Sequence, residues 1–423
     1  MKRLLVVLIV SCWLSSALGQ TAIVGARVHP VSSGPIEKGV ILIMEGRITA
    51  IGAASSVEIP PSATRIDATG KVITPGLIDV ATSLGLVEVS SIPNTRDTAY
   101  ETGNPIRAAF RASDGFNPRS IAIPVTRMGG VTTVGSIPTG GAISGQSLVV
   151  DLIDGSLQEM TVTSRAGMHA GFHPGAYAES GGSRGGLALT LRQAFQESRL
   201  FKTNQAAIQA GRFQVLRNSL LDLEALVPVI EGRTPFNIEA SRASDIAAAL
   251  RLAREWGLRV SILGGEEAWL VAGDLAQAGV RVVVQPLSNL PTQFDRLGAR
   301  FDNAALLSQA GVPVVISTRD SSNVRNLRFE AGNAVRFGMD WDAALRSITL
   351  EAARFLGIQE TRGSLETDKA ANLVIWSGDP FEFSSQVEAV FIRGREIPLE
   401  SRHTKLLERY RKLGDYPVQY RRP

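Results

Sequence analysis

The sequence predicts an α/β protein: a TIM-like (β/α)8 barrel with a small β domain that is formed by the N- and C-terminal segments. Three observations predict this fold. Strand-like and helical segments alternate along the second half of the chain, glycines follow several of the helices, and both ends are rich in short apolar strands. Repeated β-α units with apolar strands form parallel sheets, and this many units in one domain favour a barrel. We place the small β domain at residues 20–74 and 365–400, and the barrel with its long loops at residues 75–364.

The first segment, residues 1–19, has the pattern of a secretory signal peptide. Two basic residues precede an apolar run that is too short to span a membrane, and small residues precede Gln20. We therefore expect cleavage near Gly19-Gln20 and an exported protein, periplasmic or secreted. Cys12 is the only cysteine, so the mature protein would form no disulfide. No later apolar stretch is long enough for a transmembrane span.

Short strands are predicted near both ends of the chain. Their residues are apolar and β-branched, and Glu45-Gly46 between two of them is typical of a hairpin turn. Two strand-rich ends around a long middle predict one small β domain made from both. The predicted strands are residues 22–28, 40–44, 47–51, 371–376 and 387–392.

The second half of the chain alternates between strands and helices. Apolar residues recur at helical spacing in the helical segments, and Gly257, Gly279 and Gly311 follow three of them, where a C-terminal cap favours a positive φ. The predicted strands are residues 236–240, 258–263, 280–284 and 312–316. The predicted helices are residues 244–256, 267–277, 303–309, about 327–337 and 341–356.

Residues 84–230 are predicted to form long loops over barrel strands at 131–134 and 147–152. Glycines gather here, especially in the run 181–186. Glycine without a strand before it and a helix after it is weak evidence for phosphate binding. We therefore interpret this region as a flexible lid.

Charge gives no case for a nucleic-acid partner. The chain has 44 basic and 40 acidic residues, a formal net charge of +4, and loss of the signal brings it nearer to balance. Basic residues gather in residues 401–423, where Leu406, Tyr410 and Leu413 recur at helical spacing. We predict a basic C-terminal helix and tail, either docked on the body of the protein or in contact with a membrane surface or a partner.

Several motifs follow the pattern of one known family. In them the chain resembles the amidohydrolase superfamily, in particular its secreted imidazolonepropionase-like members, over about residues 21–397. The resemblance implies a (β/α)8 barrel, hydrolysis of non-peptide C–N bonds, and zinc or another divalent metal at the strand ends. The motifs are TPGLIDVATSL at residues 74–84, GVTTV at 130–134, AALRSITL at 343–350 and ANLVIW at 371–376.

The metal-binding positions of the family fall here on residues that do not bind zinc-like ions. The first-strand His-x-His falls on Ala81 and Ser83, and the sixth-strand His falls on Gly264. The fifth-strand His-Ala-His falls on Glu239 and, two residues later, Ser241. Ala, Ser and Gly cannot replace an imidazole ligand. The resemblance therefore implies a degenerate site, and we expect neither a metal nor another cofactor.

The polar residues that remain near these strand ends are the candidate site. The family's eighth-strand Asp, which takes and returns a proton, falls on or near Asp320, and Glu239 is the second candidate for catalysis. We expect Arg319 or Arg242 to hold Asp320 in an ion pair. The candidates for substrate binding are Asp79, Ser83, Ser241, Arg242, Glu266 and Arg319.

Two alternatives for a metal stay open. The four carboxylates among these candidates either hold a hard ion such as Ca²⁺ or Mg²⁺, or are leftover polar groups with hydrogen-bond partners. His169 and His173 are spaced to meet on one helical face, but Pro174 and the surrounding glycines favour a loop. Their role stays open.

The leading functional hypothesis is an exported amidohydrolase-family protein with a degenerate metal site. It would bind a small amide-like ligand, or act as a subunit beside a metal-competent amidohydrolase paralogue or in a homo-oligomer. The first alternative is an active hydrolase of cyclic amides or dipeptide-like substrates that uses a substituted site around Asp320. The second is a purely structural subunit.

Overall fold

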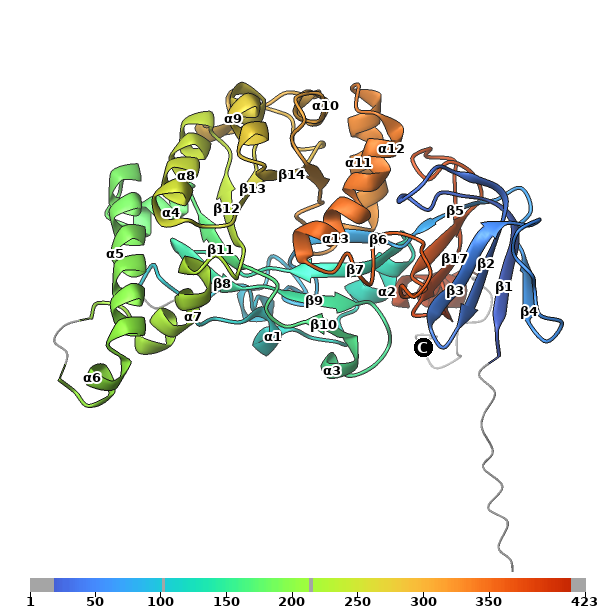
Figure 1. The fold of residues 1–423 in the computed structure, drawn as a ribbon, viewed down its shortest axis with the longest axis horizontal. Coiled ribbons are helices and arrows are strands. Elements are labelled where there is room, and N and C mark those ends of the chain that lie inside the picture. Colours follow the sequence, from blue (N-terminus) through green and yellow to red (C-terminus); the bar gives the residue numbers. More distant parts are fainter. Residues whose placement is uncertain (1–18, 101–102, 213–215, 412–423) are drawn as a thin grey trace, which may run out of the picture.

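The computed structural model describes residues 19–100, 103–212 and 216–411. The fold is mixed α/β, with a sheet from the two chain ends on one side and helices around the remaining strands (Figure 1). The expected signal peptide, apart from Gly19, and residues 412–423 of the expected tail lie outside the described residues. Across the described residues, no helix is both long and apolar enough to cross a membrane.

One eight-stranded sheet combines strands from both ends of the chain. Its order is β18-β17-β16-β5-β1-β2-β3, and β4 pairs with β1. The predicted hairpin turn is confirmed, since Met44 pairs with Arg47 across Glu45 and Gly46, which both have positive φ. That this sheet is a separate domain stays a prediction. The strands are β1 (Thr21–Val28), β2 (Ile36–Met44), β3 (Arg47–Ala53), β4 (Thr64–Asp67), β5 (Val72–Pro75), β16 (Leu373–Trp376), β17 (Val387–Ile392) and β18 (Arg395–Ile397).

The remaining strands form two sheets. One has the order β10-β9-β7-β6 and the other β15-β14-β13-β12-β11-β8. Five consecutive strands, β11 to β15, are parallel neighbours, as are β6 and β7. The strands are β6 (Leu77–Thr82), β7 (Val131–Ser136), β8 (Ile143–Gln146), β9 (Leu148–Asp151), β10 (Thr161–Thr163), β11 (Met168–Gly171), β12 (Phe236–Ala240), β13 (Val260–Gly264), β14 (Arg281–Val284) and β15 (Val314–Ile316).

The arrangement is consistent with a TIM-barrel-like domain but departs from a regular (β/α)8 barrel. β9 pairs antiparallel with β7 and β8 pairs antiparallel with β11, with Ser147 between them. One reversed segment therefore stands between two parallel groups. Within the described residues, no β-ladder joins β15 to β6, so no closed barrel is formed. The chain segments after these strands still meet, because the Ser83 N–H donates to the Asp320 carbonyl at 3.1 Å.

Helices pack around these strands, and several match the sequence analysis closely. The helix predicted at 303–309 is α10, and Gly257 and Gly311 have φ of +67° and +80°. The helices are α1 (Ala112–Gly115), α2 (Ala122–Arg127), α3 (Leu157–Met160), α4 (Pro174–Glu179), α5 (Arg184–Thr203), α6 (Gln205–Gln209), α7 (Leu220–Ile230), α8 (Ala243–Trp256), α9 (Ala272–Gln277), α10 (Asn303–Gln309), α11 (Leu327–Arg336), α12 (Trp341–Ser347), α13 (Leu350–Leu356) and α14 (Arg402–Tyr410).

Two predictions about this part of the chain were wrong. The glycine run 181–186 does not lie in a lid, because it leads into the 20-residue helix α5, whose N-cap is Ser183. Leu187 and Leu191 of α5 are buried, which the glycine-rich composition of the segment concealed. The helix predicted at 341–356 is divided into α12 and α13 at Thr349, whose φ and ψ of −134° and −91° are not helical.

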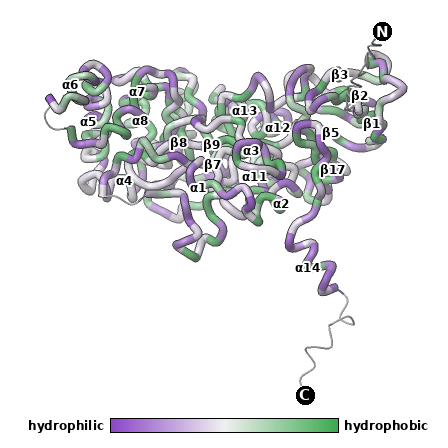
Figure 2. Tube along the Cα trace, turned by 90° about the horizontal axis from the view of Figure 1, so that it is seen from below, coloured by the Kyte–Doolittle hydropathy of each residue, from purple (hydrophilic) through white to green (hydrophobic). Residues whose placement is uncertain are grey.

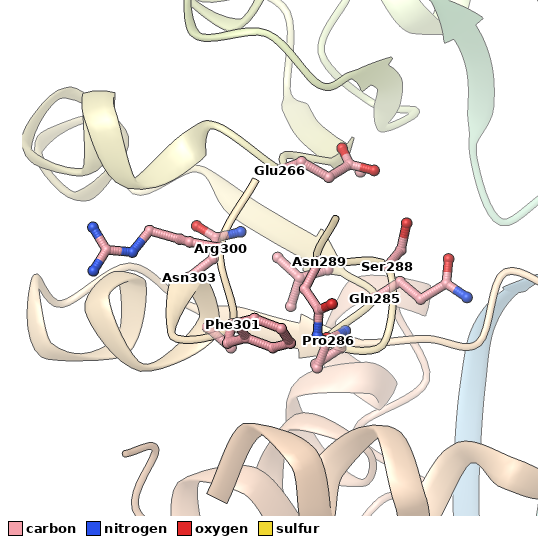
Figure 3. Close-up of a pocket in the computed structure, with 11 residues that line it drawn as sticks. Glu266, Gln285, Pro286, Ser288, Asn289, Arg300, Phe301 and Asn303 are labelled. Atoms are coloured by element: carbon pink, nitrogen blue, oxygen red, sulfur yellow. Dashed lines mark hydrogen bonds between the residues drawn. The ribbon is translucent and has the colours of Figure 1, made fainter. Parts of the chain in front are cut away.

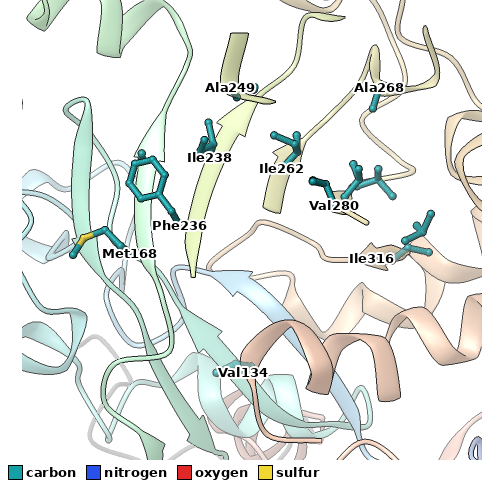
Figure 4. Close-up of a cluster of buried hydrophobic side chains, with 14 of the residues drawn as sticks. Val134, Met168, Phe236, Ile238, Ala249, Ile262, Ala268, Val280 and Ile316 are labelled. Atoms are coloured by element: carbon teal, nitrogen blue, oxygen red, sulfur yellow. The ribbon is translucent and has the colours of Figure 1, made fainter. Parts of the chain in front are cut away.

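The main core lies between the parallel strands and their helices. Met168, Phe236, Ile238 and Ile262 of neighbouring strands gather there with helical residues such as Ala249 (Figure 4). β12 and β13 are almost wholly buried because they are covered on both faces, as parallel strands usually are. A second buried cluster includes Ala81 of β6 and apolar residues of α13.

α14 stands away from the body (Figure 2). Ser401 caps it through a capping box, and none of its residues is buried. Leu406 and Leu407 are exposed. Docking on the body, one of the two alternatives for this helix, is therefore not seen in the described residues.

Candidate functional site

The carboxyl ends of the strands form one mouth, where the active sites of barrel enzymes lie. Backbone hydrogen bonds hold successive strand ends together. The Phe172 N–H donates to the Glu239 carbonyl at 2.7 Å, and the Gly265 N–H donates to the Ala240 carbonyl at 2.9 Å. The Ser317 N–H makes the corresponding hydrogen bond at the end of β15. Side chains that follow β11, β12, β13 and β15 therefore share one space.

An ion pair spans this mouth. Arg319 donates from Nη2 to Oε1 of Glu239, with side chains 17% and 37% exposed respectively. Arg319 has a φ of +49°, in the left-handed region that a long side chain rarely adopts, and its N–H donates to the Ser317 hydroxyl at 3.2 Å. The prediction that Asp320 pairs with Arg319 or Arg242 was wrong, because the turn at Arg319 directs its side chain across the mouth to Glu239.

Gly264 leaves room for this pair. A Cβ atom added to Gly264 would lie 3.2 Å from Nη1 of Arg319, 3.0 Å from Oε2 of Glu266 and 3.5 Å from the Ser241 hydroxyl. Three side chains from three different strand ends thus meet over one glycine. Its φ of +93° also disfavours any larger residue.

Glu266 closes the other side of this cluster. It is only 6% exposed, and its Oε1 lies 3.4 Å from Nη1 of Arg296. Its Oε2 has no hydrogen-bond partner in the described part of the chain. A cavity of about 10 Å³ lies beside it, lined also by Gln285, Ser288 and Asn303 (Figure 3). That volume is near the minimum for one water molecule, so this cavity alone cannot hold an organic ligand.

The charges of the cluster reinforce one another. Burial opposes ionisation of Glu239, but Arg319, His173 and Arg296 outweigh it and hold the pKa of Glu239 below its ordinary value. Burial likewise opposes the charge on Arg319, and attraction to Glu239 and Glu266 raises its pKa above the ordinary value. Both members of the pair are therefore charged at neutral pH.

Asp79 is buried completely below the mouth. It accepts from both the N–H and the hydroxyl of Thr318, at 3.0 and 2.6 Å, and from the Ser317 hydroxyl. Burial raises the pKa of Asp79, although these hydrogen bonds oppose the rise. It also accepts the Ala81 N–H of its own strand at 3.4 Å, and the bonds from Ser317 and Thr318 fasten β6 to the segment after β15.

Asp320 turns away from the mouth. One of its carboxylate oxygens accepts the N–H groups of Ser321, Ser322 and Asn323 at 2.6, 2.9 and 3.2 Å. Partial burial opposes ionisation, but these bonds outweigh it and lower the pKa of Asp320. The carboxylate caps its own loop and is not aimed at the Arg319–Glu239 pair.

Sequence reasoning missed Glu330 of α11. Its Oε2 accepts the Leu287 N–H at 2.7 Å, and burial, with a contribution from the charges of Asp79 and Asp320, raises its pKa to about 7. A signal for it exists in the sequence. Glu330 lies on the same apolar face of α11 as Leu327 and Ala331, where a carboxyl group is unexpected.

The two histidines do not lie on one helical face. His169 is in β11, and burial lowers its pKa to about 3, so it is neutral. His173 is the N-cap of α4, and its Nδ1 accepts the Ala176 N–H at 3.4 Å. His169 therefore belongs to a strand and His173 to a helix cap, so their four-residue spacing does not indicate a shared helical face.

The other candidates divide into two groups. Ser241 and Glu266 lie with the Arg319–Glu239 pair over Gly264, whereas Arg242 is exposed at the N-cap of α8. Ser83 is partly buried after β6 and contributes its N–H to the loop of Asp320. We call Glu239, Ser241, Glu266 and Arg319 the mouth cluster.

The residues at the metal positions do not fit a divalent ion. Ala81 belongs to an apolar cluster, and the space over Gly264 is taken by Arg319. Glu239 is already paired with that cation. Across the described residues, no group of three or more His, Cys, Asp or Glu residues is arranged to hold a metal. Such an ion prefers converging nitrogen or oxygen ligands without a competing cation.

Known proteins resemble the chain along most of its length. Residues 250–397 match the amidohydrolase family. Imidazolonepropionase of Rhizobium rhizogenes is 26% identical over 394 residues, which are 84% of this chain and 90% of that protein. Amidohydrolase tasK of Hapsidospora irregularis is 24% identical over 389 residues; these cover 84% of this chain, but the chain spans only 39% of that protein's length.

A solved structure shows the same fold. An amidohydrolase from Thermotoga maritima MSB8 is 29% identical, with a TM-score of 0.81 over 89% of this chain and 99% of that one. Other imidazolonepropionases are about 25% identical, for example that of Cupriavidus taiwanensis. The family match over residues 250–397, these relatives and the shared fold together show that the chain is similar to proteins of the amidohydrolase superfamily.

Proposed function

We propose that this protein is an exported amidohydrolase-family protein with a degenerate metal site, which binds a small amide-like ligand in the mouth. One observation carries the proposal. The guanidinium of Arg319 lies over Gly264, the position that the resemblance assigns to the sixth-strand His. A guanidinium there and a metal on a histidine there exclude each other, because both are cations that need the same space.

The family itself points the other way. Amidohydrolases normally use a divalent metal, and the family match therefore argues against the expectation of no cofactor. The chemistry of this chain's own residues supports the proposal against that argument. The first-strand position is an apolar Ala81, and the remaining carboxylates are engaged by arginines or by backbone N–H groups.

An active hydrolase around Asp320 has less support. A general base needs an oxygen directed at the proton that it removes, and one oxygen of Asp320 accepts three N–H groups of its own loop. The other oxygen accepts from the Asn323 side chain at 3.2 Å. Glu239, the second candidate, is held by Arg319. A purely structural subunit has no specific observation in its favour.

The test combines metal content, ligand binding and turnover on the purified protein without the signal segment. We expect no stoichiometric zinc, iron or manganese, a rise in melting temperature with small lactams or cyclic imides, and no hydrolysis of them. A ligand that binds only the native state raises the melting temperature by mass action. One metal ion per chain together with turnover would favour the hydrolase. If no small amide raises the melting temperature, the alternative of a purely structural subunit would be favoured.

Export and partners belong to the same proposal. The signal sequence supports export, to be tested by the N-terminal sequence of protein recovered from a cell fraction outside the cytoplasm. A homo-oligomer or a metal-competent amidohydrolase paralogue is the proposed partner, and light scattering with co-purification tests it.

A further inference from the structure

We propose that α14 is a membrane-surface helix. It lies on a lipid bilayer that contains anionic lipids, with Leu406, Leu407 and Tyr410 turned towards the acyl chains and its basic residues against the lipid phosphates. The occupant of this helix face is thus a bilayer surface and not another protein. The proposal is independent of the proposed function, because the mouth cluster contains no residue of α14.

The helix projects from a fixed point on the body. Leu399, two residues before the N-cap, packs against the main core, and the N-cap Ser401 is only 5% exposed. The capping box of Ser401 and Thr404 then starts the helix, which runs away from the body (Figure 2). Beyond the N-cap, every residue of α14 except Thr404 is exposed. The described part of the chain therefore holds the base of the helix and leaves its sides uncovered.

A helix of this length needs a surface to pack on. α14 has nine residues, and isolated helices shorter than about 12–15 residues are marginal in water. Most of the stability of a protein helix comes from the packing of an amphipathic face. The described residues provide no such packing for α14, so an external surface has to supply it.

The side chains of α14 divide into an apolar face and a basic face. Residues three or four positions apart share one side of a helix. Leu406, Leu407 and Tyr410 meet this spacing and are 37%, 67% and 50% exposed. A second set at the same spacing is basic and lies beside the apolar face; it consists of Arg402, Lys405 and Arg409.

Charge selects an anionic bilayer as the occupant. Residues 401–411 include four basic residues and one acidic residue, a charge of +3 out of the formal net charge of +4 for the whole chain. Lys405 pairs with Glu400 at 3.1 Å, but the two side chains are 67% and 63% exposed, so this pair is weak and lipid phosphates can replace it. A helix with leucines on one face and basic residues on the other is typical of the membrane interface.

The size of the apolar face argues against a protein partner. Three large side chains bury roughly 400 Å² at most, about half of the ~800 Å² that each partner buries in a stable protein interface. A bilayer needs no matching shape, and each basic residue near an anionic surface strengthens binding by roughly fivefold. At about 13 Å the helix is too short to span a hydrocarbon core of about 30 Å, so it lies on the surface.

The experiment measures co-sedimentation of the protein without its signal segment with two kinds of lipid vesicle. One is pure phosphatidylcholine, and the other is phosphatidylcholine with a quarter of phosphatidylglycerol, which is anionic. We expect the wild type to bind the anionic vesicles about tenfold or more tightly than the neutral ones. Raising the salt concentration from about 0.1 to about 0.5 M should weaken this binding, because salt screens the attraction.

Two double variants separate the apolar face from the basic face. Leu406→Ser with Leu407→Ser, and Arg402→Gln with Arg409→Gln, should each weaken binding to the anionic vesicles by about tenfold or more. Neither should change the melting temperature, since none of these residues is buried.

Matched controls remove similar groups from other helices. Leu189→Ser with Leu221→Ser replaces two leucines that are each 67% exposed, as Leu407 is. Arg251→Gln with Arg336→Gln removes two exposed arginines of α8 and α11. Both controls should bind the anionic vesicles like the wild type.

Three results would overturn the proposal. The first is a wild type that does not bind the anionic vesicles. The second is binding that either α14 variant retains in full, or that the controls lose to the same extent. The third is a wild type that forms dimers instead, which the variant with Leu406→Ser and Leu407→Ser no longer forms, because a second copy of the chain would then cover this face.

Discussion

Replacing Glu330 by Gln should make the stability of this protein less dependent on pH. Glu330 is 3% exposed, and burial raises its pKa from an ordinary 4.5 to about 7. A carboxyl group with a raised pKa in the folded state favours folding only while it is protonated. The free energy of unfolding should therefore fall as pH rises from about 4.5 to about 7 and then level off. The two pKa values correspond to a loss of roughly 3 kcal/mol, at about 1.4 kcal/mol per unit.

The assay is urea denaturation of the wild type and Glu330→Gln at several pH values between 4 and 8. Gln keeps an oxygen that can accept the Leu287 N–H, and any cost of the substitution that does not depend on pH is the same throughout the series. We expect the variant to gain on the wild type across this range by up to about 3 kcal/mol. A difference between the two proteins that is constant from pH 4 to pH 8 would refute the reasoning.

Three further outcomes are expected. Asp151→Ala should cost about 3–5 kcal/mol of unfolding free energy, because this fully buried carboxylate accepts from Arg362 at 2.6 Å and Arg393 at 2.6 Å. The control Glu388→Ala, in an exposed ion pair, should cost at most about 1 kcal/mol, and similar urea midpoints for the two variants would contradict this. A chelator should leave the melting temperature unchanged, and a fall of several degrees would show a metal that supports the fold. Asp320→Asn should lower the stability by about 1 kcal/mol at neutral pH without removing any amide hydrolysis, and a stable variant that loses a clear wild-type activity would show a catalytic acid instead.

The order of strands and helices in the second half of the chain could be predicted from the sequence, because hydrophobic periodicity and residue composition determine such elements locally. Strand β12 and helix α10 have the predicted bounds, because an apolar strand and a capped helix are each specified by neighbouring residues. Helix α5 was missed because glycines lie before and within its first turn, while the residues that bury it, such as Leu191, come later. The antiparallel pairing of β8 and β9 depends on contacts with other strands, and no local sequence pattern predicts it.

The residues of the candidate site could be found from the sequence, but not their pairing. Glu239 lies near the end of β12, Glu266 and Arg319 follow strands, and strand ends meet at one edge of a parallel sheet. Which carboxylate Arg319 contacts depends on its φ of +49°, which turns its side chain away from its neighbour Asp320. The buried Glu330 comes from a helix, so a search restricted to strand ends could not include it.

The sheet that joins the two ends of the chain sets a condition on how the protein folds. β5 pairs with β16, and Trp376 donates to the Thr74 hydroxyl across 302 positions of sequence. Until β16 has been synthesised, the edge of β5 has no partner there and can pair with other chains instead. Contacts between such distant segments slow folding, because the intervening chain must first be closed into a loop. A nascent or truncated chain that ends before β16 therefore carries an open strand edge, which makes it prone to aggregation.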